Sequence, residues 1–104
     1  MKYIPENNAK KIREVLESCK ELGGVIFQLF DSDGHLGTYR NVENVLEEMD
    51  GGDDCITVWV MDKGEGELGY ISFLPYEPEP EDVILDYSNN TFIGRILGWK
   101  NLCL

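Results

Sequence analysis

Cys55-Ile-Thr-Val-Trp-Val-Met61 is followed by Asp62-Lys-Gly-Glu-Gly-Glu67 and then by Leu68-Gly-Tyr-Ile-Ser-Phe-Leu74, and Pro75 ends the run. Two segments rich in β-branched and aromatic residues, joined by a short connection that contains glycine, are typical of a β-hairpin. We expect the rest of the chain to be organised around this hairpin, because its apolar side chains must be buried against other elements.

The side chains of the first strand point alternately to the two faces of the sheet. One face carries Ile56, Val58 and Val60, and the other carries Thr57, Trp59 and Met61. Because both faces are largely apolar, we expect an inner strand that is covered on both sides. Trp59 would then be structural, and its truncation to alanine would cost roughly 3–5 kcal/mol.

A helix is predicted near the N-terminus, because apolar residues recur at helical spacing between residues 9 and 22. Asn7 or Asn8 can cap the first turn of this helix. Gly23-Gly24 ends it, since glycine tolerates the positive φ that a helix C-terminus often needs.

A second hairpin and a short helix lie between these elements. Residues 25–30 and 36–40 read as strands, and Asp33-Gly34 between them is a pair favoured in type I′ turns. Asn41 is a predicted N-cap for a helix whose inward face is apolar. That face carries Val42, Val45, Leu46 and Met49.

The chain after Pro75 is harder to assign. Residues 75–80 alternate proline with acids and should be extended. Pro80-Glu-Asp-Val has proline and acids where the first turn of a helix favours them, so we prefer one helical turn from there through Tyr87, with a short strand at Val83–Tyr87 as the alternative. Ser88-Asn-Asn90 can cap a last short helix that Gly98 ends, and the tail from Trp99 should pack against the body.

The order of these elements predicts the α+β class. We expect an antiparallel sheet of about four strands, formed by two β-hairpins, with an N-terminal helix, a short middle helix and a short C-terminal helix packed on it. The length of 104 residues is that of one compact domain, so residues 1–104 are taken as a single unit.

The charge is strongly negative, with a formal net charge of −11. Between Glu43 and Asp82 the acids are opposed by Lys63 alone. A field of this sign repels nucleic acid and anionic membranes and attracts basic surfaces. We therefore expect no direct contact with nucleic acid or with a membrane. Solubility alone explains the acidity equally well, because net charge governs association rather than fold.

The three cysteines are an odd number without a short-range pairing pattern, which favours free thiols in a reducing cytosol. The first residues have no apolar signal core, and no run approaches the 18 apolar residues of a membrane span. The predicted location is cytoplasmic.

Residue patterns for catalysis or for a cofactor are weak. His35 is the only histidine, and no phosphate-binding loop or Cys-x-x-Cys pair is present. Asp31, Asp33 and His35 resemble the start of a calcium loop, but the position of its closing glutamate is Val42. We predict no enzyme, no cofactor and no intrinsic metal site.

The end of the middle helix breaks a local rule. Acids near a helix C-terminus face the negative end of the helix dipole and cost about 0.3–1 kcal/mol each. Such violations often occur at functional sites, and Gly51-Gly52 lets the chain turn and present these acids together. The predicted partner-binding residues are Glu47, Glu48, Asp50, Asp53 and Asp54, with Glu65 and Glu67 of the hairpin turn as further members.

The function that these features favour is that of a small acidic binding protein or inhibitor. Its carboxylate-rich face would engage a basic protein, for example a nucleic-acid-binding one, as nucleic-acid mimics and phage- or plasmid-borne immunity or anti-defence proteins do. The alternative is an accessory or oligomerisation domain whose acidity only serves solubility. A third candidate is an enzyme or metal protein that uses Asp31, Asp33 and His35. The sequence leaves open whether the chain forms a homodimer.

Overall fold

The computed structural model describes the backbone of residues 3–100 and the side chains of residues 3–98. The elements in chain order are α1 (Glu6–Glu21), β1 (Ile26–Asp31), β2 (Gly34–Tyr39), α2 (Val42–Met49), β3 (Ile56–Met61), β4 (Glu67–Phe73), the 3₁₀ turn η1 (Pro80–Asp82), β5 (Ile84–Tyr87) and α3 (Thr91–Lys100). The strands form one antiparallel sheet in the order β2-β1-β3-β4-β5. The predicted α+β class and the three helices are confirmed, and the sheet has a fifth strand.

The fifth strand is β5, in the segment for which we preferred a helical turn. A helical turn does form at Pro80–Asp82, as η1, but the preference was wrong from residue 84 onward, where the alternative strand forms. Val83 is fully buried, and its carbonyl oxygen accepts a hydrogen bond of 2.6 Å from the backbone N–H of Leu74. This contact directs the next residues along β4, where Asp86 pairs with Ser72.

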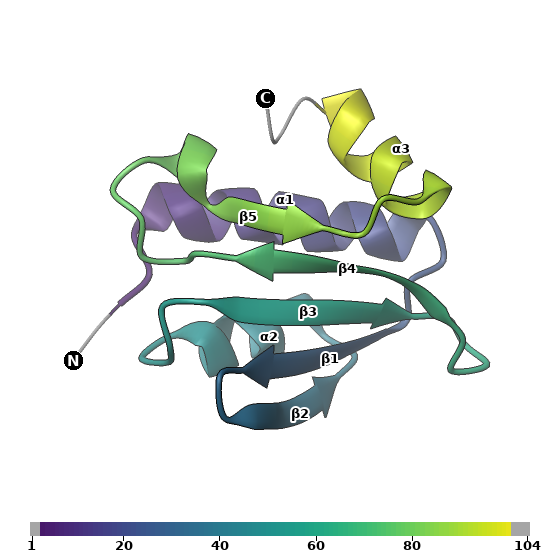
Figure 1. Cartoon of the computed structure of the whole chain (residues 1–104), viewed down its shortest axis with the longest axis horizontal. Helices are drawn as coiled ribbons and strands as arrows, with labels where there is room; N and C mark the ends of the chain where they lie inside the picture. The colour runs from purple at the N-terminus through teal and green to yellow at the C-terminus, as the bar shows by residue number, and fades with distance from the viewer. Residues whose placement is uncertain (1–2, 101–104) are drawn as a thin grey trace.

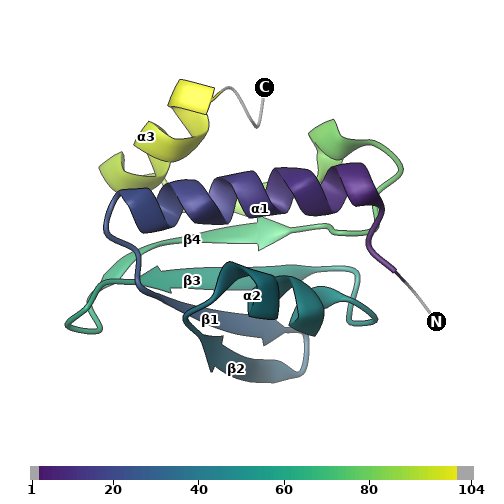
Figure 2. The same cartoon turned by 180° about the vertical axis from the view of Figure 1, so that it is seen from behind.

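All three helices lie on one side of the sheet. α1 and α2 lie behind the strands in Figure 1 and in front of them in Figure 2, and α3 packs against both α1 and β4. The sheet residues that face the helices are fully buried, and they include Phe27, Leu29, Ile56, Val58, Val60, Ile71 and Phe73. The core therefore lies in a single layer between sheet and helices.

The opposite side of the sheet, which we call the uncovered face, has no helix of residues 3–100 over it (Figure 1). Its central side chains are Gln28, Phe30, Thr57, Trp59, Met61, Tyr70 and Ser72. β3 is an inner strand as predicted, but the expectation that both its faces are covered was wrong. Trp59 is partly exposed, and its ring contacts that of Tyr70 with centroids 4.9 Å apart. Aromatic and β-branched residues suit a strand surface whether or not a second layer covers it.

The N-terminal helix begins earlier than the capping residues predicted. Pro5 is its N-cap, and neither Asn7 nor Asn8 caps it. Asn8 is instead buried, and its side-chain amide donates hydrogen bonds to the carbonyl oxygens of Pro75 and Glu77, at 2.9 and 2.7 Å. A polar side chain buried in this way ties α1 to a loop almost seventy residues away.

Of the two helix ends predicted at glycines, one is confirmed and one is wrong. α1 ends at Glu21, and Gly23 has a φ of +107°, as the predicted helix end requires. α3, however, continues through Gly98 to Lys100, so the predicted stop at Gly98 was wrong. The predicted packing of the tail concerns side chains from Trp99 onward, which lie outside the described residues.

The turn of the first hairpin is shifted by one residue from the prediction. Asp31 pairs with Gly34, so Ser32 and Asp33 are the central residues, and neither has a positive φ. Gly34 takes the positive φ, +122°, as the first residue of β2. The Asn41 cap is confirmed, since its side-chain oxygen accepts from the N–H groups of Glu43 and Asn44.

No helix among the described residues is both long enough and apolar enough to cross a lipid bilayer.

We predict that the same polar substitution destabilises neighbouring positions of β3 to different extents. Val58→Asn should lower the free energy of unfolding by roughly 3–5 kcal/mol, because the amide is buried without a partner. Trp59→Asn should cost roughly 1–2 kcal/mol, because its amide remains hydrated on the uncovered face. Urea unfolding of the two variants measures the difference. Equal losses at the two positions would mean that β3 is covered on both sides.

Candidate functional site

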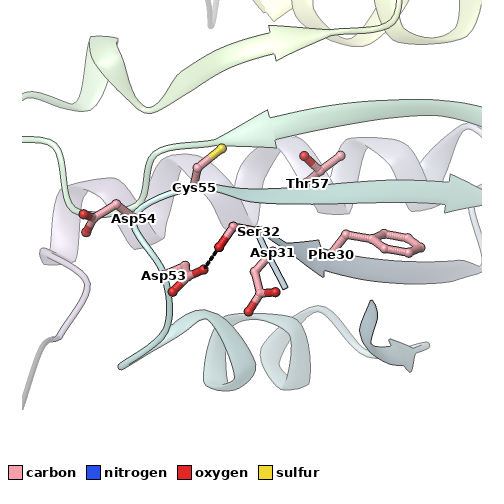
Figure 3. A pocket seen from close by; sticks show the side chains of 7 residues that line it. All are labelled: Phe30, Asp31, Ser32, Asp53, Asp54, Cys55 and Thr57. Atoms are coloured by element: carbon pink, nitrogen blue, oxygen red, sulfur yellow. Dashed lines mark hydrogen bonds between the residues drawn. The ribbon is translucent and has the colours of Figure 1, made fainter. Parts of the chain in front are cut away.

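One pocket among the described residues lies where β1 ends and β3 begins. It has a volume of about 530 Å³, and its lining residues are Phe30, Asp31, Ser32, Asp53, Asp54, Cys55 and Thr57. Figure 3 shows these side chains around the start of β3, with α1 and α2 behind the sheet. We call it the acidic pocket. It opens on the side of the uncovered face, since Phe30 and Thr57 belong to both.

Three carboxylates converge at the acidic pocket. One oxygen each of Asp31, Asp33 and Asp53 lies within 4.8 Å of the others. The Ser32 hydroxyl donates to Asp53 Oδ2 at 2.9 Å, and the N–H of Asp33 donates to Asp31 Oδ1 at 2.8 Å. Like charges at this spacing repel one another, so the group favours a cation. That cation can be a metal ion or a basic side chain.

The segment that carries Asp53 is fixed from the far side by Tyr76. The N–H groups of Gly51 and Gly52 donate to the Tyr76 hydroxyl at 2.6 and 3.2 Å, and this hydroxyl donates to the Met49 carbonyl oxygen at 2.8 Å. One phenol thus satisfies groups at the end of α2 and in the bend that follows it. Asn8 in turn holds the residues on either side of Tyr76.

The predicted partner-binding residues of α2 do not face the acidic pocket. Glu47 and Asp50 line a smaller hollow of about 170 Å³ on the helix side, together with Arg13 and Glu43. Asp50 Oδ1 accepts from the N–H of Ile4 at 2.9 Å. Arg13 forms a two-pronged ion pair with Glu43, at 2.6 and 3.1 Å, which holds the pKa of the Glu43 carboxyl below its usual value.

Glu48 is engaged by a neighbouring strand. The hydroxyl of Tyr39 on β2 donates a hydrogen bond to Glu48 Oε1, and this bond raises the pKa of the Tyr39 phenol. The predicted group is therefore divided by the structure. Glu47, Glu48 and Asp50 belong to the helix side, whereas Asp53 and Asp54 line the acidic pocket.

Glu65 and Glu67 lie at the opposite end of β3 from the acidic pocket (Figure 1). The six residues of β3 separate the two ends by about 20 Å. Asp62 shapes this turn, since its Oδ1 accepts from the N–H groups of Gly64 and Gly66 at 2.9 and 2.8 Å. The structure therefore does not join Glu65 and Glu67 to Asp53 and Asp54 in one cluster.

The acid that joins Asp31 and Asp33 was not predicted from the sequence. A calcium loop would place its closing acid at residue 42, but Val42 is buried as the first residue of α2. The third carboxylate comes from Asp53, beyond a whole helix. The available signal was the pairing of β1 with β3, because antiparallel neighbours bring the end of one beside the start of the other.

The described thiols and the histidine are not arranged for nucleophilic chemistry. Burial raises the pKa of the Cys19 thiol to about 12. Partial burial, and then the charge of Asp53, raise the pKa of Cys55. Both thiols are therefore protonated at neutral pH. His35 lies on β2, where its ring contacts Phe30 at 5.1 Å. Cys103 lies outside the described residues.

Comparisons with protein-family models, with curated proteins and with solved structures give no match to this chain.

We predict that Tyr76→Phe loosens the bend at Gly51-Gly52. The change removes the acceptor of the Gly51 N–H, whereas the Gly52 N–H and the Met49 carbonyl oxygen keep their own hydrogen bond of 3.0 Å, so the free energy of unfolding should fall by about 1 kcal/mol. Amide hydrogen exchange at Gly51 and Gly52 should also accelerate. Tyr3→Phe is the matched control, because Tyr3 is 67% exposed and should change neither quantity. Unchanged exchange at the bend in Tyr76→Phe would contradict this role.

The absence of an intrinsic metal site stays a prediction. The cluster of Asp31, Asp33 and Asp53 is the place at which to test it. Millimolar calcium, magnesium, manganese or zinc should leave the melting temperature unchanged, because partly exposed carboxylates remain hydrated. Asp53→Asn should raise it slightly by removing repulsion. A saturable rise of several degrees with one ion, lost in Asp53→Asn, would contradict the prediction.

Proposed function

We propose that this protein is a small acidic binding protein or inhibitor that engages a basic surface of another protein. The observation that supports this most is the acidic pocket, where three carboxylates converge beside a sheet face that no described helix covers. A cationic side chain that enters there relieves the repulsion among Asp31, Asp33 and Asp53. The proposal extends the predicted binding residues Asp53 and Asp54 by two acids of the first hairpin.

Electrostatics favour a protein partner with a positive surface. A net charge of −11 on 104 residues steers basic molecules toward the chain and repels nucleic acids. Carboxylates held on a fixed backbone can stand in for phosphates, as in nucleic-acid mimics and in immunity or anti-defence proteins. The partner class is therefore a basic, nucleic-acid-binding protein. A phage or plasmid origin and a cytoplasmic location belong to the same proposal.

The uncovered face supplies the apolar part of such an interface. Trp59 and Tyr70 are partly exposed at its centre, and aromatic residues are enriched where proteins bind one another. Charge at the rim sets the rate and the specificity of association, while buried aromatic contacts supply most of the affinity. Binding requires no reaction, so the protein is proposed to act without catalysis.

A second candidate is an oligomerisation domain whose acidity only serves solubility. The edge strand β5 favours it, since Leu85 is 58% exposed and Tyr87 is 40% exposed. A homodimer that buries this edge would form at a concentration-dependent midpoint and would persist in high salt. Sedimentation at several concentrations distinguishes it from charge-dependent binding of a basic partner.

We predict that the two acidic groups differ in binding. The partner is obtained by affinity capture from a native lysate and then purified. Asp53→Asn with Asp54→Asn should weaken its binding about tenfold and flatten the salt dependence, because these acids line the acidic pocket. Glu47→Gln with Glu48→Gln is the matched control on the helix side and should change affinity less. The Asp53 and Asp54 variant should melt at or slightly above the native temperature, and the control slightly below it, because Glu48→Gln weakens the hydrogen bond from the Tyr39 hydroxyl.

Unchanged affinity and an unchanged salt slope in the Asp53 and Asp54 variant would contradict the proposal. The acids would then be a solvated surface, and the oligomerisation candidate would be favoured.

A further inference from the structure

A second pocket lies on the uncovered face, toward the end of β3 that is far from the acidic pocket. Its lining residues are Gln28, Phe30, Trp59, Met61 and Glu67, and its volume is about 190 Å³. We call it the aromatic pocket. The strand register explains its composition, because Gln28 pairs with Trp59 and Met61 pairs with Glu67.

The walls of the aromatic pocket combine apolar surface with one charge. Phe30, Trp59 and Met61 are partly or largely buried, and contact with Tyr70 at 4.9 Å supports the indole ring. Glu67 is exposed at the edge and forms no ion pair with another described residue. The side-chain amide of Gln28 offers a further acceptor. The pocket is thus apolar along its length and negative at one end.

We propose that the aromatic pocket receives an arginine side chain of the basic partner. This inference rests on the proposed function and adds a specific contact to it. The stem of arginine is apolar, and its guanidinium stacks on aromatic rings and binds a carboxylate with two parallel hydrogen bonds. Trp59 supplies the ring and Glu67 supplies the carboxylate.

The size and charge of the pocket exclude other occupants. Pockets that hold whole small ligands usually measure about 300–1,000 Å³, so 190 Å³ fits one inserted side chain better. An apolar side chain would fill the aromatic part of the pocket but leave the Glu67 carboxylate without a cationic partner. An anionic side chain would be repelled. Lysine satisfies the charge but cannot stack a planar group on Trp59 or bind Glu67 with a fork of two donors.

The position of the pocket agrees with a partner that lies across the whole uncovered face. The two pockets are neighbours, since Phe30 lines both, but their acids Asp53 and Glu67 lie near opposite ends of β3, a strand of six residues about 20 Å long. A positive surface that places one cation at Asp53 and an arginine beside Glu67 therefore spans the sheet. Two separated charged contacts fix the register of a partner better than one.

The test is an NMR titration of the full chain with a short, blocked glycine peptide that has one central arginine. Matched peptides carry lysine or citrulline, which has a similar shape to arginine without its charge. The arginine peptide should shift the Trp59 indole N–H and the Met61 methyl signals saturably. The lysine peptide should bind about threefold more weakly, and the citrulline peptide should not saturate.

Glu67→Gln should weaken the arginine peptide by about three- to tenfold, as the loss of one partly hydrated ion pair implies. Asp53→Asn is the matched control and should leave the Trp59 shift unchanged, because Asp53 lies at the other end of β3. Glu67 is exposed, so its variant keeps the fold, which the unperturbed part of the spectrum verifies. Equal binding of the arginine and citrulline peptides, or no effect of Glu67→Gln, would overturn the inference.

The outcomes separate the inference from the proposed function. If Asp53→Asn weakens the captured partner but Glu67→Gln does not, the function stands and the arginine contact is wrong. If the arginine peptide binds at Trp59 while neither variant affects the captured partner, the pocket is real and the proposed function is wrong.

Discussion

The structure depends on the one-sided burial of β3. Ile56, Val58 and Val60 are completely buried against helices, while Trp59 on the next position faces outward and remains partly exposed. The three α-helices of residues 3–100 all pack on the same side of the sheet and close a single core layer (Figure 2). Gly69 shows how tightly that layer is packed, since a Cβ there would overlap Ile93 of α3. What remains is a sheet face with aromatic side chains and no described helix over it.

As a result, the acidic residues of the chain lie on different sides of the sheet and in different surroundings. Asp53 lies with Asp31 and Asp33 beside the uncovered face, near the start of β3. Glu67 borders the aromatic pocket near the end of β3, where it pairs with Met61. Glu47 lies behind the sheet, near the Arg13–Glu43 ion pair. Clustering along the sequence therefore overstates clustering in space. The carboxylates near the uncovered face lie beside partly exposed aromatic side chains. Under the proposed function, a basic partner contacts these carboxylates and the aromatic side chains together.

Short-range sequence patterns predicted most of the helices and strands but few of the contacts between them. The hairpin around residues 62–67 and the Asn41 cap follow from short-range rules and are confirmed. The buried role of Asn8, the hydroxyl of Tyr76 at the α2 end and the meeting of Asp53 with Asp31 depend on segments more than twenty residues apart. Rules based on the spacing of residues along the sequence cannot predict such contacts. Local rules also could not predict that only one face of β3 is covered. The apolar residues on both faces of this strand are compatible with a sheet covered on one side or on both.

Carboxyl footprinting of the chain, alone and with its purified basic partner, tests the central claim most directly. A carbodiimide and a neutral amine label exposed carboxylates, and mass spectrometry of peptides measures the extent at each position. The account predicts that the partner protects Asp53, Asp54 and Glu67, while Glu14 and Glu17 on the exposed side of α1 are labelled as before. Protection of α1 acids with unchanged labelling of Asp53, Asp54 and Glu67 would contradict it.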